Sequence, residues 1–436
     1  MDNKTAATVR RHLWIIILPV AFLVYATSFS GIPILEQRHS VLAEADSASF
    51  RLLIQEFDLS RQYGDQYNMD HRSLGDIAQK HKIHHALYVI VASLIYHGFA
   101  GLYEFMGVPA GYALYSINAL LAVCNIVLLA VLLRWFHGDR LNRFGYLALY
   151  AFSLSTWIYG SVPESWTFSA TLILGFLLIF YVYRPHVSVL AVYIGVAMLN
   201  NVLLGSLLLF PVLEAGCVSR RFGEFARTVG VGGAITGATW LAALSGLSVF
   251  DGSFRPDEFL RYTRWFKQYL AYGLSLWDPY VWKVVVSNLF INTVVSHQSD
   301  PAVPQQALLS TIRESYLGLG ATLAYLGLAV VGVVGVGRRF AREVGGVRSL
   351  RELLGRDDLQ LAVYCLTWMG LTLVLFPPAA FLYSTAVVPL VVVLIARGLQ
   401  PERASHALWL YAAVAAVILN NTSQVVIFRN ALRAAF

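Results

Sequence analysis

The sequence predicts an all-α polytopic membrane protein with about eleven transmembrane helices and two large external loops that carry interfacial helices. Of its 436 residues, 57% are hydrophobic and only 13% are charged. An ordinary soluble domain has about twice that share of charged residues. Apolar runs long enough to cross a bilayer recur along the chain, and arginines gather in the short segments between them. The net charge of +7 therefore reports membrane topology rather than a nucleic-acid partner.

The first predicted helix, residues 13–29, follows Lys4, Arg10 and Arg11. No small-residue cleavage pattern closes it, which favours a retained signal anchor over a signal peptide that is removed. Cations in front of the first helix predict a cytoplasmic N-terminus by the positive-inside rule. The polar stretch 31–85 is therefore expected outside.

Most of the other apolar runs have the length of one crossing. Segment 187–215 is too long for one simple crossing, and Asn200 and Asn201 interrupt it. We expect two short helices there, which meet near the outer surface. The simple spans are residues 110–133, 143–160, 165–183, 228–250, 315–337, 360–376, 380–396 and 407–425.

Segment 86–106 is apolar enough to cross the membrane, yet it also carries tyrosines, a histidine and a glutamate. If it crosses, Arg134, Arg140 and Arg143 fall outside. If it lies in the outer interface as an amphipathic helix, those arginines fall inside, together with the arginine-rich loop 338–358. The charge bias favours the interfacial helix.

The residues that could carry chemistry gather in the two external loops, 31–109 and 251–314. In the first, Glu44 and Asp46 stand soon after the first helix, and carboxylates at the mouth of an apolar protein are costly unless they bind or react. Asp46 also has a structural alternative, because it stands where an amphipathic helix would need an N-cap.

Glu164 is a further candidate carboxylate at an external turn. It follows Pro163 and precedes an apolar helix. The structural alternative is that it only favours the dipole at the start of that helix.

A basic cluster near the end of the first loop could meet a lipid phosphate at the membrane surface. Its members are Lys80, His81, Lys82, His84 and His85. The alternative is a solvated rim that faces lipid headgroups. Carboxylates and imidazoles together could also hold a divalent metal ion, but a ligand set cannot be assembled from the sequence.

In the second loop, Arg261, Arg264 and Lys267 recur at helical spacing beside aromatic residues. Such a helix could lie on the membrane surface with its cations toward phosphate. The alternative is an ordinary interfacial anchor of Trp, Tyr and Arg. His297 is a lone histidine of the same loop, and such a residue is more often structural.

Two other patterns carry no chemistry of their own. The glycine-rich stretches 229–238 and 330–337 lie inside predicted membrane helices, without a preceding strand or a Lys-Ser/Thr pair, so close helix packing explains them better than nucleotide binding. Cys124, Cys217 and Cys365 lie in apolar segments or a short basic loop, and they indicate no disulfide framework.

In this layout the chain resembles the GT-C superfamily of membrane glycosyltransferases, which take a sugar from a polyprenyl-phosphate or related lipid donor. Glu44 and Asp46 match the acidic motif that these proteins carry early in a large first external loop. Glu164 matches a second acidic residue in the external turn after their third helix, and 251–314 matches their second large loop. The resemblance covers residues 1 to about 315 and the remaining helices only loosely.

The resemblance implies a module of residues 1–314 that holds the catalytic site, followed by C-terminal helices in 315–436. The acidic motif is not a clean DxD, and the basic cluster is histidine-rich where some relatives have a Tyr-Pro or Lys-Pro pair. These departures leave the identity of the donor open.

The implied activity is sugar transfer from a polyprenyl-phosphate donor to a glycan, lipid or protein acceptor at the outer, periplasmic or equivalent, face of a bacterial inner membrane. Asp46 would be the general base, and Glu44 and Glu164 would orient the acceptor or a metal ion. A single displacement would invert the anomeric centre. The donor phosphate would meet basic residues of both loops: Lys80, Lys82, His84, His85, Arg261, Arg264 and Lys267.

The main alternative is a multi-span transporter or lipid flippase, which would share the apolar spans and the interruption at Asn200 and Asn201. Such a protein should carry charged residues within its spans, whereas here the acidic residues concentrate on one side. A membrane scaffold without catalysis is the third possibility, and two external loops rich in carboxylates argue against it.

Overall fold

The computed structural model describes the chain in these segments: 13–30, 51, 54–55, 85–137, 143–218, 222–250, 279–295, 315–344, 355–375, 383–399 and 404–435. Every regular element in them is a helix, so the predicted all-α class is confirmed for the part of the chain that they cover.

The described helices include several that could cross a bilayer by length and composition. Six qualify: Ala86–Phe105, Ala110–His137, Ser165–Tyr183, Thr228–Leu247, Tyr316–Arg342 and Ser405–Asn430. Further apolar helices are too short to cross alone. The protein is therefore an integral membrane protein of mainly apolar helices, while the count of about eleven crossings stays a prediction.

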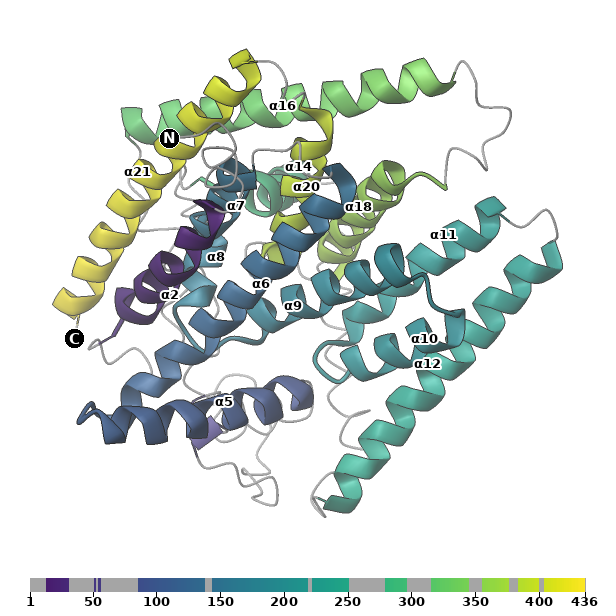
Figure 1. The fold of residues 1–436 in the computed structure, drawn as a ribbon, viewed down its shortest axis with the longest axis horizontal. Helices are drawn as coiled ribbons and strands as arrows, with labels where there is room; N and C mark the ends of the chain where they lie inside the picture. Colours follow the sequence, from purple (N-terminus) through teal and green to yellow (C-terminus); the bar gives the residue numbers. More distant parts are fainter. Residues whose placement is uncertain are drawn as a thin grey trace, which may run out of the picture.

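The first half of the chain forms a helical body in which short 3-10 and π turns join α-helices (Figure 1). Its elements are η1 (Leu13–Ile16), α2 (Ile17–Ser28), α5 (Ala86–Phe105), η3 (Ala110–Tyr112), α6 (Ala113–His137), α7 (Arg143–Ala151), α8 (Leu154–Gly160), α9 (Ser165–Leu178), η5 (Ile179–Tyr183), α10 (Val187–Ala197), η6 (Val202–Leu208), α11 (Leu209–Val218) and α12 (Phe222–Phe250).

The helices of the second half pack against the same body. Asn421 donates to the carbonyl of Phe152, and the rings of Tyr383 and Trp166 are in contact, so residues on both sides of position 314 share one core. These elements are α14 (Pro279–Val286), η7 (Ser287–Ile291), α16 (Tyr316–Val344), α18 (Asp357–Leu375), α20 (Val388–Gly398) and α21 (Ala404–Ala435).

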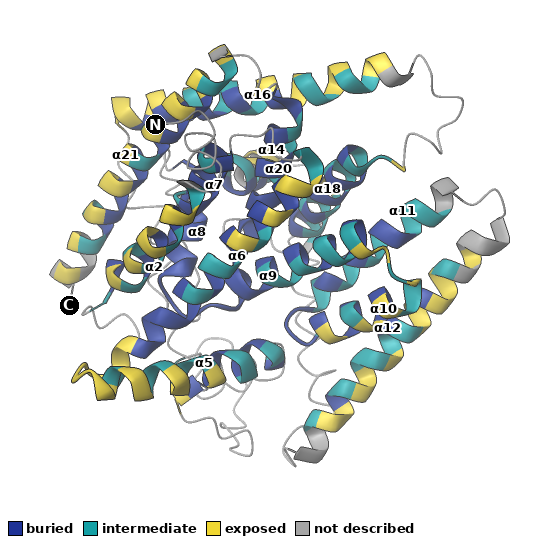
Figure 2. Ribbon diagram, in the orientation of Figure 1, coloured by how far each residue is buried: buried dark blue, intermediate teal, exposed yellow. Residues whose placement is uncertain are grey.

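The most buried helices lie at the centre of the body. Figure 2 shows α6 and α9 largely buried, whereas α12, α16 and α21 at the edges carry exposed stripes. Leu323, Val330 and Val333 of α16 and Leu419 of α21 are among the exposed apolar side chains. In a membrane protein such faces contact lipid, so their exposure costs nothing.

The expected interruption of 187–215 is present. α10 ends at Ala197, and Asn201 caps the next turn by accepting a hydrogen bond from the Leu203 N–H at 2.9 Å. Because an asparagine side chain can take the place of a backbone hydrogen-bond partner, Asn201 starts the next helix at this point.

A second break was not expected. The predicted span 143–160 is divided between α7 and α8, near Phe152 and Ser153. The N–H groups of Leu154 and Ser155 donate to the carbonyls of Val294 and Thr293, at 3.3 and 2.9 Å. Backbone groups inside a membrane need partners, and here a segment distant in the sequence supplies them.

Helix α5 lies across α6 instead of running back along it. Tyr88 donates to Asn118 at 2.8 Å, and Tyr103 bonds Ser116 at 2.6 Å. The two tyrosines are fifteen residues apart on α5, which is about 22 Å of helix, yet their partners are two residues apart on α6. The interfacial position of 86–106 stays a prediction, because Ala86–Phe105 also has the length and composition of a crossing.

The two ends of the helical body differ in charge. At one end, which we call the arginine end, Arg184 and Arg356 interact with Asp357, while Arg397 and Arg339 interact with His137. The other end holds Glu164 at the start of α9, and we call it the Glu164 end. Asn118 and Phe136 mark the two ends on α6, eighteen residues apart. That separation is about 27 Å, which is close to the thickness of a hydrocarbon core.

Candidate functional site

Glu164 is buried at the N-terminus of α9. Its side chain is the N-cap: Oε1 accepts from the Ser165 N–H at 2.9 Å and from Ser165 Oγ at 3.2 Å. Only 2% of the residue is exposed. Glu164 thus caps α9, a role that sequence analysis did not consider for it, and the helix dipole favours its negative charge there. A cap does not need a buried carboxylate, however, since serine or asparagine is preferred at such positions.

Asn118 of α6 fixes the turn that carries Glu164. Its Nδ2 donates to the carbonyls of Tyr159 and Glu164, both at 2.8 Å, and its Oδ1 accepts from the Tyr88 hydroxyl at 2.8 Å. Asn118 and Tyr88 are fully buried. The carboxamide therefore ties the end of α8, the start of α9 and the first turns of α5 together.

Asn200 connects the same turn to the start of α5 from another side. Its Nδ2 donates to Ser169 Oγ at 2.8 Å and to the Ser165 carbonyl at 3.4 Å. Its backbone carbonyl lies 2.5 Å from Nδ1 of His85. A carbonyl oxygen can only accept, so Nδ1 of His85 carries the hydrogen. Nε2 is then the acceptor of the neutral ring.

Aromatic side chains cover the first turn of α9. The ring of Trp166 meets that of Tyr383 in an edge contact with centroids 4.3 Å apart, and Trp368 donates its indole N–H to the Tyr383 carbonyl at 3.1 Å. On the other side the rings of Phe168 and Tyr88 lie 6.3 Å apart. Because Tyr383 belongs to 315–436, the C-terminal helices also border the site.

The arrangement joins a carboxylate, an imidazole and several amides in a buried polar network. A carboxylate such as that of Glu164 can orient or deprotonate a hydroxyl group, and the His85 ring can donate a hydrogen bond to an anion once Nε2 is protonated as well as Nδ1. Sequence analysis selected Glu164, His85 and the Asn200–Asn201 interruption separately, and the structure brings them together at one end of α9. It missed Asn118 and Tyr88, since an asparagine within an apolar helix is the only signal of their role.

The other predicted site residues lie outside the described residues. They are Glu44, Asp46, Lys80, Lys82, His84, Arg261, Arg264 and Lys267. The described segments contain no group of three or more His, Cys, Asp or Glu side chains that could hold a metal ion. The possible metal site therefore stays a prediction that concerns the external loops.

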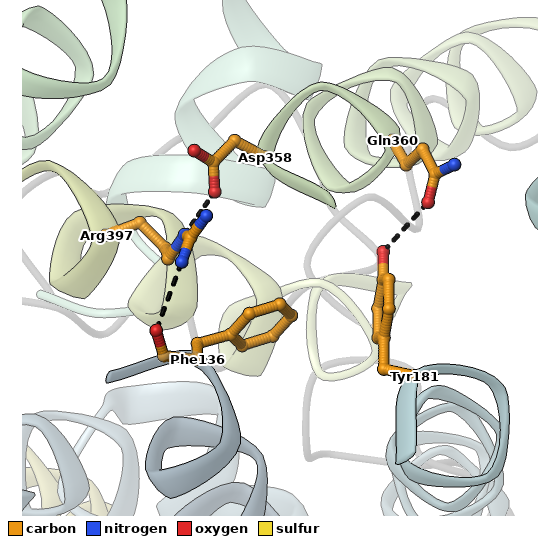
Figure 3. Close-up of polar contacts among 5 residues, drawn as sticks. All are labelled: Phe136, Tyr181, Asp358, Gln360 and Arg397. Carbon is orange, nitrogen blue, oxygen red and sulfur yellow. Dashed lines mark hydrogen bonds and ion pairs between the residues drawn. The ribbon is translucent and has the colours of Figure 1, made fainter. Parts of the chain in front are cut away.

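A second polar cluster at the arginine end was also missed by sequence analysis (Figure 3). Arg397, in the last turn of α20, pairs with Asp358 in the first turn of α18 and donates to the Phe136 carbonyl at 3.2 Å. Tyr181 donates to Gln360 at 3.2 Å. These contacts join the ends of α6, α20, α18 and η5, which is a structural role.

Burial also affects the neighbouring carboxyl group. It raises the pKa of Asp357, and Asp358 adds to this, while Arg397, Arg184 and Arg356 oppose it. Asp357 thus lies near three arginines and a second carboxylate, beside the contacts that join the helix ends.

Comparisons with known proteins give little further information. No family model matches the chain, and no curated protein matches it. Among solved structures, the crystal structure of ArnT from Cupriavidus metallidurans bound to undecaprenyl phosphate is similar with a TM-score of 0.38 and 16% sequence identity. The match covers 95% of this chain and 78% of the ArnT chain. Similarity at this level does not by itself assign a function.

Proposed function

We propose that this chain is a membrane glycosyltransferase of the GT-C type, which transfers a sugar from a polyprenyl-phosphate donor to a glycan, lipid or protein acceptor. The reaction takes place at the outer face of the membrane. The protein resides in the inner (plasma) membrane of a bacterial cell, with its N-terminus in the cytoplasm. The enzyme inverts the anomeric centre, because one base and one displacement are sufficient.

The observation that carries the proposal is the burial of the Glu164 carboxylate at the end of the helical body opposite the arginines. Ionisable groups at membrane depth are costly and usually functional. The positive-inside rule assigns the arginine end to the cytoplasm, so the Glu164 end belongs to the outer side. This is the side on which the resemblance to GT-C enzymes expects the acidic residues.

In the proposed reaction Asp46 removes the proton of the acceptor hydroxyl, whose oxygen attacks the anomeric carbon. The bond between that carbon and the phosphate oxygen breaks, and the lipid phosphate leaves with the electron pair. Glu164 and Glu44 orient the acceptor. His85, when Nε2 is protonated as well as Nδ1, and the cations of the two external loops stabilise the charge on the leaving phosphate.

The test is transfer of radiolabelled sugar from a panel of polyprenyl-phosphate donors to a native membrane extract. We expect purified wild-type protein to be active and Glu164→Gln to reduce kcat by at least about 100-fold. Glutamine keeps an oxygen for the Ser165 N–H, so the thermal midpoint should change little. Asp46→Asn should be at least as damaging.

Glu214→Gln is the matched control, since Glu214 is a partly buried carboxylate near Arg184 and Asp357 at the arginine end. It should keep the wild-type rate. Equal rates for wild type and Glu164→Gln would remove Glu164 from the mechanism but leave the enzyme class standing. No transfer from any donor, together with solute uptake into proteoliposomes, would reject the glycosyltransferase.

One observation favours the transporter as second candidate. The break between α7 and α8 lies within a predicted span, and its backbone groups bond to Thr293 and Val294 of another segment. Discontinuous helices of this kind form binding sites in secondary transporters. The described residues around this break are uncharged, which favours a structural break over an ion pathway.

A further inference from the structure

Asn200 has an unusual position for a residue at a helix break. It is completely buried, and it makes hydrogen bonds in two directions with different groups. The side chain reaches α9, while the backbone carbonyl reaches α5. Capping of the following turn is the work of its neighbour Asn201, so the break itself does not need the Asn200 side chain.

The bonds of Asn200 end at the two segments that hold the candidate functional groups. Ser165, whose carbonyl accepts from Nδ2, is also the residue whose N–H and hydroxyl bind the Glu164 carboxylate. Ser169, one turn further along α9, accepts the shorter bond. On the other side, the carbonyl holds Nδ1 of His85. Asn200 therefore contacts His85 directly and is connected to Glu164 through Ser165.

A further contact strengthens the connection to α5. The Leu87 N–H in the first turn of α5 donates to the carbonyl of Leu199 at 3.4 Å, and the next carbonyl, that of Asn200, binds His85 just before this helix. The first N–H groups of a helix lack partners within the helix. The break at Asn200 thus serves as a cap for α5 and fixes where His85 stands.

We infer that Asn200 is a positioning residue that sets the Glu164 carboxylate and the His85 imidazole relative to each other. This rests on the proposed function and deepens it, since it assigns a distance-setting role to a residue outside the predicted site. Asn200 contacts no substrate. The side chain anchors the carbonyl, so removing the carboxamide loosens the His85 contact as well as the contact with α9.

Asn200 Oδ1 is buried, and no group in the described residues donates a hydrogen bond to it. Because the two hydrogens of Nδ2 are directed at Ser169 and Ser165, the orientation of the carboxamide follows from these acceptors. An unsatisfied buried acceptor has a cost. We interpret this cost as a sign that the bonds from Nδ2 to Ser169 and Ser165 are more important than a partner for Oδ1.

The test compares Asn200→Ala with Asn201→Ala in the full-length protein. We expect Asn200→Ala to lower kcat by about 100-fold with little change of KM for the donor, because the reacting groups lose their mutual geometry. Asn201→Ala removes only the cap of the next turn and should stay within about threefold of wild type. Thermal midpoints show whether either variant is unfolded.

A double-mutant cycle separates positioning from general stability. If Asn200 acts through Glu164, Asn200→Ala should cost less than about threefold in a Glu164→Gln background. Full additivity of the two effects would overturn the inference.

Hydrogen–deuterium exchange provides a readout that needs no turnover. Asn200→Ala should speed exchange by about tenfold in the peptides that cover 85–89 and 165–169, whereas Asn201→Ala should affect only the peptide after position 201. Unchanged exchange in both peptides would overturn the inference even if transfer is observed. If no donor supports transfer, the proposed function fails, and the exchange result still decides whether Asn200 holds the two segments together.

Discussion

Asn118 shows how a single polar residue inside an apolar helix can determine a local structure. Its carboxamide donates to two backbone carbonyls and accepts from one hydroxyl, and all of these groups are away from water. The partners come from two segments that are distant in the sequence, the start of α5 and the turn between α8 and α9. Such a network is stable when it is complete and costly when one member is missing.

We expect Asn118→Leu to destabilise the protein by about 3 kcal/mol or more, because Tyr88 and the carbonyls of Tyr159 and Glu164 each lose a buried hydrogen bond to Asn118. Tyr88→Phe alone should cost less than Asn118→Leu, because it removes one of these contacts and leaves the two carbonyl contacts in place. Thermal unfolding in detergent measures both effects. Thr171→Val is the control, because the Thr171 hydroxyl bonds only within its own helix. An equal shift in the control would contradict the assignment.

The ion pair at the arginine end gives a second prediction. Arg397→Leu leaves the carboxylate of Asp358 buried and without its cation, which should cost about 3–5 kcal/mol. Arg397→Lys should recover only part, because lysine cannot bind Asp358 and the Phe136 carbonyl with one planar group. Arg338→Gln, at an exposed position of α16, is the control. If Arg397→Leu unfolds at the wild-type temperature, the contacts of Arg397 with Asp358 and the Phe136 carbonyl do not contribute to stability.

At the scale of elements, the packing of α16 against α20 depends on missing side chains. A Cβ at Gly335 would overlap the carbonyl of Gly398, and a Cβ at Gly398 would overlap the carbonyl of Gly332. The two backbones therefore pack in direct contact, as small residues allow between membrane helices. This confirms that the stretch 330–337 serves helix packing.

Gly335→Ala should force α16 and α20 apart and destabilise the protein by about 1–3 kcal/mol. Gly337→Ala is a close control on the same helix, because nothing lies within 4 Å of its added Cβ. It should be neutral, or stabilising by up to about 1 kcal/mol through helix propensity. Chemical or thermal unfolding of the two variants side by side measures the difference. Equal destabilisation would mean that the two helices are not packed in this way.

At the scale of the whole molecule, the sequence predicts features that depend on local composition. Hydropathy locates long apolar helices such as α6, α16 and α21, and the Asn200–Asn201 pair locates the interruption of 187–215, because an apolar run and a capping residue act through the local sequence. The sequence does not predict the break between α7 and α8, because the groups that satisfy it come from Thr293, Val294 and Asn421.

The residues of the candidate site also divide into those that the local sequence identifies and those that depend on distant contacts. Glu164 and His85 are recognisable as charged or titratable residues beside apolar helices. Their connection through Asn200 and Asn118 depends on how α5 crosses α6 and α9, and no local pattern encodes that crossing. Tertiary contacts of neutral amides are the part of a membrane protein that composition predicts least.

The break between α7 and α8 also offers a test that separates the two candidate functions. Ser155 Oγ and Thr293 Oγ1 lie 2.7 Å apart, and the Ser155 N–H donates to the Thr293 carbonyl. A Ser155→Cys, Thr293→Cys pair, with the three native cysteines replaced by serine or alanine, should therefore form a disulfide under mild oxidation.

A transferase whose chemistry takes place near Glu164 uses this region as a fixed support, so the oxidised protein should transfer sugar within about twofold of its reduced form. A transporter must rearrange such a break in each cycle, so uptake into proteoliposomes should stop on oxidation and return with reductant. Each single cysteine variant, treated in the same way, controls for oxidation elsewhere. Loss of sugar transfer in the oxidised pair alone would show that the break moves during catalysis, and the view of a rigid support would have to be abandoned.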